Sequence, residues 1–204
     1  MIETTKERTN FEQDAIDSTD QVSNIISLVD YSFEKDLKNI ENPNILILGI
    51  GPFFPEAILL KKYSENIDKK IDITCVDQKM PLRDYPEQLF NLRNSDNFRM
   101  DLIESRFENF QLNDNSYDLV LLLRSSNLSL FNRNIFNNIY NGLKANGVFI
   151  ISGGVKDEID INSLVGNNLQ LECIKKIPQG TKDYWNSYVG TNTVAKFKKN
   201  ENDI

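Results

Sequence analysis

Residues 45–52 read ILILGIGP, an unbroken apolar run that ends in two glycines. Continuous branched side chains are typical of a parallel strand buried on both faces, and the glycines favour a tight turn after it. A helix is expected over residues 55–65, because Pro55 suits a first helical turn, where no amide hydrogen is needed. This unit predicts an α/β domain with its ligand site at the carboxyl ends of the strands.

Six further segments are predicted as strands. Two of them are short apolar runs, and the last two alternate in polarity. The six are residues 71–76, 101–104, 117–123, 148–151, 169–174 and 191–198. The last two have no helical pattern between them, so they are expected to pair antiparallel. Helical patterns separate the others, at 87–93, 129–144 and 161–164, with a left-handed cap at Asn146. The prediction is a mostly parallel seven-stranded α/β sheet with helices on both faces and a C-terminal antiparallel hairpin.

Three regions are expected along the chain. Residues 1–20 are polar and predict a mobile arm. Residues 21–41 predict an N-terminal cap helix, because apolar side chains recur there at steps of three and four residues, at Val22, Ile25, Ile26, Val29 and Phe33. Residues 42–199 would form the α/β domain.

Composition excludes several classes of protein. The chain has 204 residues, 23 Lys and Arg against 30 Asp and Glu, and a net charge of −7, which disfavours bulk nucleic-acid binding. It has no histidine, so Ser-His-Asp hydrolysis and most transition-metal sites are excluded and no metal is expected. A mean hydropathy of −0.42 and two cysteines predict a cytoplasmic protein with reduced thiols, no membrane span and no signal segment.

The candidate site begins at the glycine turn. Gly49 and Gly51 would let the backbone approach a ligand closely, and the helix after them favours negative or polar groups at its N-terminus. Asp77 ends the next strand, where an acid takes ribose hydroxyls in nucleotide-binding folds. A structural turn with a surface aspartate is the alternative. Asp118 begins a strand at the opposite edge and is expected to be a turn or cap residue, and Cys75 an inert buried thiol.

Four stretches together resemble a class I S-adenosylmethionine-dependent methyltransferase of the Rossmann-like kind. They are ILILGIGP, ITCVDQKM, FENFQLNDNSYDLVLLLRSS and IYNGLKANGVFIISGG, which match the family's glycine loop, acidic second strand, fourth strand and entry to the fifth strand. The resemblance covers residues 44–198. It implies S-adenosylmethionine as cofactor, held by Gly49, Gly51, Pro52, Asp77, Gln78, Ser105, Arg106 and Ser125.

The chain departs from the family pattern at three places. An acid usually stands two residues before the first glycine, but here that position is Ile47. The third glycine position is Phe53, and the acid near the adenine is replaced by Ser105 or Arg106. The carboxylate that would orient the methionine amino group is therefore missing. The glycine-proline form of the loop is also similar to nicotianamine synthase, which transfers a different part of the same cofactor.

Arg124, Ser125, Ser126 and Asn127 follow the most hydrophobic strand. In the family, substrate and catalytic groups gather there, which implies that Asn127 holds the acceptor atom and Arg124 an anionic substrate. Capping of the next helix is an equal alternative.

The function expected is methyl transfer to a small-molecule acceptor. Two alternatives remain: a methyltransferase-like binding or scaffold protein without catalysis, and a transferase of the aminocarboxypropyl or aminopropyl arm.

Overall fold

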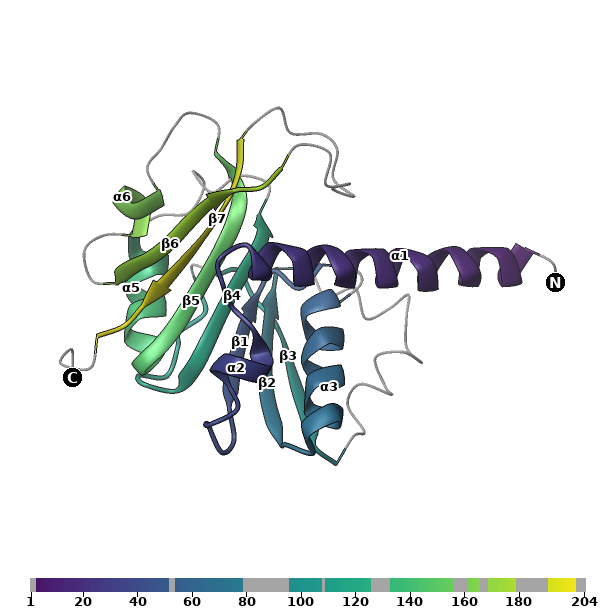
Figure 1. Ribbon diagram of the computed structural model, residues 1–204, viewed down its shortest axis with the longest axis horizontal. Helices are drawn as coiled ribbons and strands as arrows, with labels where there is room; N and C mark the ends of the chain where they lie inside the picture. Colours follow the sequence, from purple (N-terminus) through teal and green to yellow (C-terminus); the bar gives the residue numbers. More distant parts are fainter. Residues whose placement is uncertain are drawn as a thin grey trace.

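The structure is a computed structural model that describes residues 3–51, 54–78, 96–107, 109–125, 133–155, 161–165, 169–178 and 191–200. Its centre is a seven-stranded sheet of order β3-β2-β1-β4-β5-β7-β6 (Figure 1). The strands are β1 Asn44–Leu48, β2 Ile71–Asp77, β3 Phe98–Glu104, β4 Tyr117–Ser125, β5 Leu143–Val155, β6 Gln170–Lys176 and β7 Thr191–Lys198. The helices are α1 Glu3–Ser27, α2 Phe33–Asp36, α3 Pro55–Ile67, α5 Arg133–Gly142 and α6 Ile161–Val165.

The strand directions confirm the predicted topology. β1 pairs parallel with both β2 and β4, β2 with β3 and β4 with β5, whereas β7 runs antiparallel between β5 and β6. Chain order reverses at β1, because the strands lead outward to β3 on one side and to β4 on the other. A topological switch point of this kind is where ligands bind in open α/β sheets.

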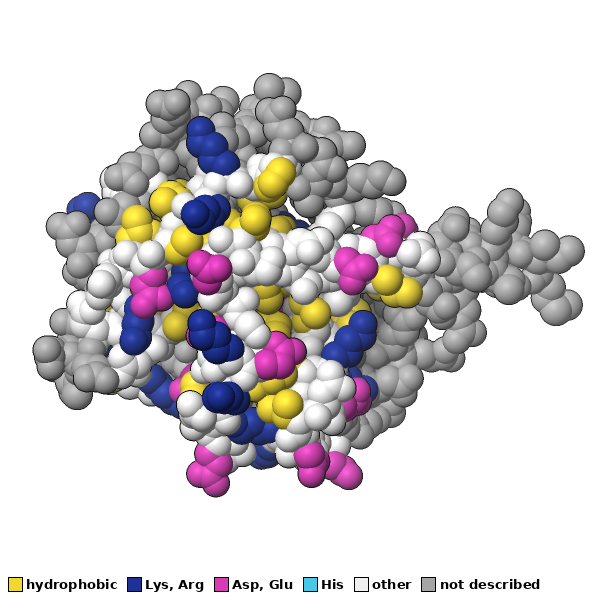
Figure 2. Space-filling model, in the orientation of Figure 1, with side chains coloured by type: hydrophobic (Ala, Val, Ile, Leu, Met, Phe, Trp, Pro, Cys, Tyr) yellow, Lys and Arg dark blue, Asp and Glu magenta, His cyan; other side chains and the backbone are white. Residues whose placement is uncertain are grey.

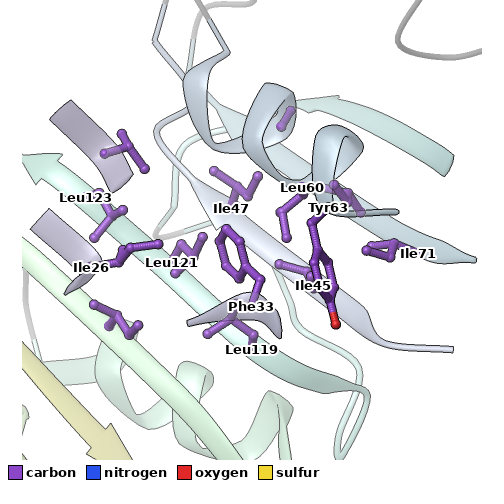
Figure 3. Packing of buried hydrophobic residues seen from close by; sticks show 14 of the residues in the cluster. Ile26, Phe33, Ile45, Ile47, Leu60, Tyr63, Ile71, Leu119, Leu121 and Leu123 are labelled. Atoms are coloured by element: carbon purple, nitrogen blue, oxygen red, sulfur yellow. The ribbon is translucent and has the colours of Figure 1, made fainter. Parts of the chain in front are cut away.

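Two hydrophobic clusters enclose β1. Ile45 and Ile47 belong to a cluster that includes side chains of α1, α2 and α3 (Figure 3). Leu46 and Leu48 belong to the other, which includes side chains of α5 and α6. Successive side chains of a strand point to opposite faces, so this alternation explains why every position of the run had to be apolar.

The N-terminal region differs from the expectation. The first helix was predicted to begin at residue 21, after a mobile arm, but α1 begins at Glu3, so residues 3–20 are helical as well. Ala15, Ser18 and Thr19 are buried, and their small size lets the helix approach the domain without a long apolar stripe. The N-terminal half of α1 projects past the sheet in Figure 1. None of the helices in the described ranges is long and apolar enough to cross a membrane.

The predicted helix over residues 21–41 is also shorter than expected. α1 ends at Ser27, and Asp30 has a positive φ of 53°, which a continuing helix cannot contain. Ser32 then donates its amide hydrogen to the Asp36 carboxylate at 2.9 Å, and α2 starts as a separate turn. The apolar side chains keep their helical spacing in the sequence across this break, because Phe33 of α2 packs in the same cluster as Val29.

The boundary between α5 and β5 also differs from the prediction. α5 ends at Gly142, not at Lys144, and β5 begins at Leu143. Asn146 has the expected left-handed φ of 63°, but it lies within β5 and donates its amide hydrogen to the carbonyl of Lys199 at 3.1 Å. β3 likewise begins earlier than predicted, at Phe98. The expected helix at 87–93 lies outside the described residues.

A buried lysine fastens the end of the sheet far from the glycine turn. Lys199 is 3% exposed. Its ammonium donates to Asn115 Oδ1 at 3.0 Å and to the carbonyls of Tyr140 and Leu143 at 3.0 and 2.8 Å. It also lies 4.6 Å from the centre of the Tyr140 ring. One cation therefore satisfies carbonyls at the C-terminus of α5, where positive charge is favoured.

A buried ion pair fastens α1 and α3 to β4. Arg124 at the end of β4 donates from Nη1 to Ser18 Oγ of α1 at 2.6 Å and from Nη2 to Glu56 Oε1 of α3 at 3.3 Å. The side chains of Arg124 and Glu56 are 12% and 1% exposed. Burial raises the pKa of the Glu56 carboxyl above its ordinary value, and the charge of Arg124 opposes that rise.

Lys199→Met keeps the aliphatic stem but leaves buried carbonyls without a donor. We expect the free energy of unfolding to fall by about 2–3 kcal/mol, as for hydrogen bonds to a charged group. Urea unfolding at pH 7 measures the loss. Lys198→Met is the matched control, because the Lys198 side chain forms no hydrogen bond or ion pair with a described residue, although its backbone pairs within the sheet. Equal losses in the two variants would contradict the role given to Lys199.

Glu56→Gln tests the raised pKa of Glu56. Its ordinary value is 4.5, so the folded protein binds more protons than the unfolded chain above that pH, and wild-type stability falls as pH rises through the folded pKa. Glutamine does not titrate. We therefore expect the stability of Glu56→Gln relative to wild type to increase from pH 4.5 to 7.5 in urea unfolding series. The exposed Glu65→Gln in the same helix is the control, and a flat difference for Glu56→Gln would show that its pKa is not raised.

Candidate functional site

The glycine turn joins β1 to α3 at the switch point. Gly49 and Gly51 have positive φ angles of 77° and 63°, which other residues rarely adopt. Gly49 donates its amide hydrogen to the carbonyl of Val76 at 2.8 Å, so the turn stays attached to β2. A Cβ on Gly49 would lie 3.5 Å from the Phe107 ring. Gly49 and Gly51 are each half-buried, and the Phe107 ring is the group nearest to the missing side chain of Gly49.

Asp77 lies against this turn. Gly51 donates its amide hydrogen to Asp77 Oδ2 through a long bond of 3.4 Å, and Asp77 is half-buried at the end of β2. The carbonyl of Asp77 accepts the amide hydrogen of Ser105 at 2.9 Å. These two bonds, one to the side chain and one to the backbone of Asp77, join the ends of β1, β2 and β3 at this residue.

The structure places several of the predicted cofactor residues in this group. Gly49, Gly51, Asp77 and Ser105 are brought together by the bonds above. Gln78 and Arg106 are exposed beside them, each following a member of the group in sequence. Pro52 lies outside the described residues.

Arg124 adjoins the turn from the other side. Its Nη2 lies 4.0 Å from where a Cβ on Gly51 would be. Its φ is 55°, a left-handed conformation that is uncommon for a long side chain, and its amide hydrogen is donated to Ser152 Oγ of β5 at 2.9 Å. Its predicted role with an anionic substrate stays a prediction, because the contacts present are those to Glu56 and Ser18.

The remaining predicted residues follow Arg124 directly. The backbone of Ser125 pairs with Gly153 of β5, which fixes the end of β4. Ser126 and Asn127, the predicted catalytic residue, lie outside the described residues.

Sequence reasoning missed Glu56, Ser18 and Phe107. An acid in the first turn of a helix was a signal for Glu56, because it is favoured by the helix dipole. Its ion pair with Arg124 joins residues far apart in sequence, so no local pattern could have found it. Ser18 lay in the region expected as an arm.

Asp118 was expected to be a turn or cap residue, but it lies within β4, whereas Cys75 is a buried thiol as expected. Asp118 Oδ2 accepts hydrogen bonds from the Asn44 amide at 2.9 Å and from Lys144 Nζ at 2.7 Å, at the amino ends of β1 and β4. Cys75 is fully buried, and burial raises the pKa of its thiol well above the ordinary value, with the charges of Glu56 and Asp101 adding to the rise. A thiol of this kind is a poor nucleophile.

The residues present fit the nucleoside half of S-adenosylmethionine. A half-buried carboxylate beside a glycine turn can accept ribose hydroxyls, and residues without a side chain let a ligand approach the backbone closely. The family's acid before the first glycine has no counterpart, because Ile47 is 1% exposed and packs in the core. Within the described ranges, no three carboxylate or thiol side chains are grouped so that they could hold a metal ion.

The chain is similar to proteins of known structure, but not to any family model or curated sequence. No family model matches the chain, and no curated protein matches it in sequence. Among solved structures, the N-methyltransferase NodS from Bradyrhizobium japonicum WM9 is 13% identical, with a TM-score of 0.57 over 94% of this chain and 98% of that one.

Two other solved structures give the same picture. A SAM-dependent methyltransferase from Aquifex aeolicus is 13% identical, with a TM-score of 0.54 over 89% of this chain and 98% of that one. The [4+2]-cyclase SpnF is 14% identical, with a TM-score of 0.60 over 85% and 80%. At these identities the likeness is one of fold, and the chain has the Rossmann-like α/β fold of class I S-adenosylmethionine-dependent methyltransferases.

Proposed function

We propose that this protein is an S-adenosylmethionine-dependent methyltransferase that acts on a small-molecule acceptor. The observation that carries the proposal is the contact between the Asp77 carboxylate and Gly51 at the switch point of the sheet. A fold alone does not define a reaction, but a carboxylate at this position beside a glycine turn is the arrangement that receives a ribose. We also infer that helices cover both faces of the sheet, which the two separate clusters support.

The protein's part in the reaction would be positioning. The cofactor supplies an activated methyl group on a sulfonium, which needs no metal. Gly49, Gly51 and Asp77 would hold the nucleoside, with Ser105 and Arg106 beside the base. Ser125, the last residue of β4, would also contact the cofactor. Asn127, two positions further along the sequence, would hold the acceptor in line, and this positioning supplies most of the rate. Because the chain has no histidine, Asp, Glu, Lys, Tyr or water would have to accept any proton.

Charge supports a small acceptor. The net charge is −7, and Figure 2 shows lysine, arginine and acidic side chains interspersed on the face that carries α1 and α2. A mixed, net acidic surface does not favour a long phosphate backbone. The two cysteines are free thiols, which supports a cytoplasmic location.

Loss of catalysis is the second candidate, and a specific observation favours it. Ile47 occupies the position of the family's acid and is buried in the core, so no charge is available there. A binding or scaffold protein would retain the nucleoside contacts without turnover. Transfer of the aminocarboxypropyl or aminopropyl arm is the third candidate, supported only by the form of the glycine loop.

One product assay separates these candidates. The protein is incubated with S-adenosylmethionine and a pool of small amines, alcohols and carboxylates, and the nucleoside product is identified by mass. Methyl transfer leaves S-adenosylhomocysteine, and transfer of the aminocarboxypropyl arm leaves methylthioadenosine. Binding without either product above the protein-free control would favour the scaffold candidate.

Asp77→Ala should weaken S-adenosylhomocysteine binding. Removal of a carboxylate that accepts ribose hydroxyls costs about 1.5–3 kcal/mol, which is about a 10- to 150-fold loss of affinity. Isothermal titration calorimetry measures it. Asp101→Ala on the exposed side of β3 is the control and should bind as wild type does. Unchanged affinity in Asp77→Ala would remove this residue from the site.

Asn127→Ala should lose turnover and keep its affinity for S-adenosylhomocysteine, because its partner is the acceptor and not the donor. If Asn127 only caps the next helix, the variant would instead lose about 1 kcal/mol of stability and keep full turnover. The product assay, calorimetry and a thermal melt on the same preparation distinguish the two. A destabilised and fully active variant would contradict the catalytic role.

A further inference from the structure

The ion pair between Arg124 and Glu56 is incompletely bonded although it is buried. Glu56 is 1% exposed, and its Oε2 has no hydrogen-bond partner among the described residues. The Nε of Arg124 also has none in that part of the chain. The single contact between them measures 3.3 Å, longer than the 2.7–2.9 Å usual for such pairs.

An arrangement of this kind is unfavourable unless something else completes it. Removing two charges from water costs free energy. Their mutual attraction offsets that cost only when the geometry is good and the remaining donors and acceptors are satisfied. Apolar side chains of similar volume would pack equally well without this cost. Arg124 is further held in a left-handed backbone conformation, and strain of this type is concentrated at functional sites.

The pair also lies beside the proposed cofactor site. Arg124 Nη2 is 4.0 Å from the Cβ position of Gly51, and Gly51 itself is bonded to Asp77. Asp77, Gly51, Arg124 and Glu56 are therefore in one continuous row across the carboxyl ends of β2, β1 and β4. The acidic end of that row binds the ribose in the proposed function.

We propose that Arg124 and Glu56 form a subsite for an α-amino-acid zwitterion, which in S-adenosylmethionine is the methionine end. Arg124 takes the carboxylate through its unpartnered Nε and remaining Nη hydrogens, and Glu56 Oε2 takes the ammonium group. The assignment rests on the proposed cofactor. It explains how the chain manages without an acid at Ile47, because Glu56 supplies the carboxylate from α3 instead.

The chemistry of the ligand matches the pair in two respects. A planar guanidinium binds a carboxylate through parallel hydrogen bonds, with better geometry than a lysine would give. A buried carboxylate with one satisfied and one unsatisfied oxygen can accept from a primary ammonium without giving up its ion pair. The ligand thus adds one charge of each sign and leaves the net charge of the site unchanged.

The test compares two ligands that differ only at this end. S-adenosylhomocysteine carries the amino-acid zwitterion, and methylthioadenosine has the same nucleoside and sulfur without it. Calorimetry on the full chain gives both affinities for wild type, Arg124→Met and Glu56→Gln. We expect each variant to lose at least about 10-fold in S-adenosylhomocysteine affinity, as for lost charged hydrogen bonds, and to bind methylthioadenosine within about 2-fold of wild type. Lys144→Met, which removes a paired cation at the opposite edge, should change neither.

The outcomes distinguish the subsite from the proposed function. Wild type that binds neither ligand would overturn both the cofactor and the subsite. Wild type that binds both, with variants that lose both equally or lose neither, would overturn the subsite alone and identify the pair as a tie between α1, α3 and β4. Retained methylthioadenosine binding shows that a variant is folded. If Arg124→Met fails to fold, Glu56→Gln, which keeps its shape and a hydrogen-bond acceptor for Arg124, decides the question.

Discussion

Burial of β1 on both faces is the constraint on which the rest of the structure depends. Its four central side chains, Ile45–Leu48, are at most 3% exposed, and they alternate between two separate clusters. A strand in that position must pair on both sides, which β2 and β4 do. The chain can then leave only at the carboxyl end, where it must turn sharply toward α3. The glycine turn and the site around it follow from that exit.

Buried charge is used differently at the two ends of the sheet. Lys199 donates hydrogen bonds to three acceptors, two of them carbonyls where α5 meets β5. Its ammonium group therefore finds its partners inside the domain. Arg124 and Glu56, at the carboxyl ends of the strands, leave a donor and an acceptor without a partner in the described part of the chain. Fully satisfied hydrogen bonds around a buried charge, as at Lys199, stabilise a fold. Unsatisfied donors and acceptors, as at Arg124 and Glu56, are available to a ligand.

The two acids nearest the switch point have different surroundings and therefore different parts. Asp77 is half-buried at the end of β2 and accepts a bond from the backbone of the turn. Glu56 is enclosed in the first turn of α3, where burial raises its pKa and Arg124 offers a charge of opposite sign. An acid that remains accessible suits hydroxyl groups, whereas a buried one with an unsatisfied oxygen is stabilised by a further donor that carries positive charge.

The sequence by itself determined the succession of the seven strands along the chain, the exit of β1 through two glycines and the position of Asp77 at the end of β2. These depend on local periodicity and on the backbone freedom of glycine, which a short window of residues contains. Tertiary structure decided that the helix extends before residue 21, because Ala15, Ser18 and Thr19 are polar or small residues that become buried against the domain. It also decided the meeting of Glu56 with Arg124, since a contact between two elements so far apart along the chain exists only once the sheet has brought their ends to one edge.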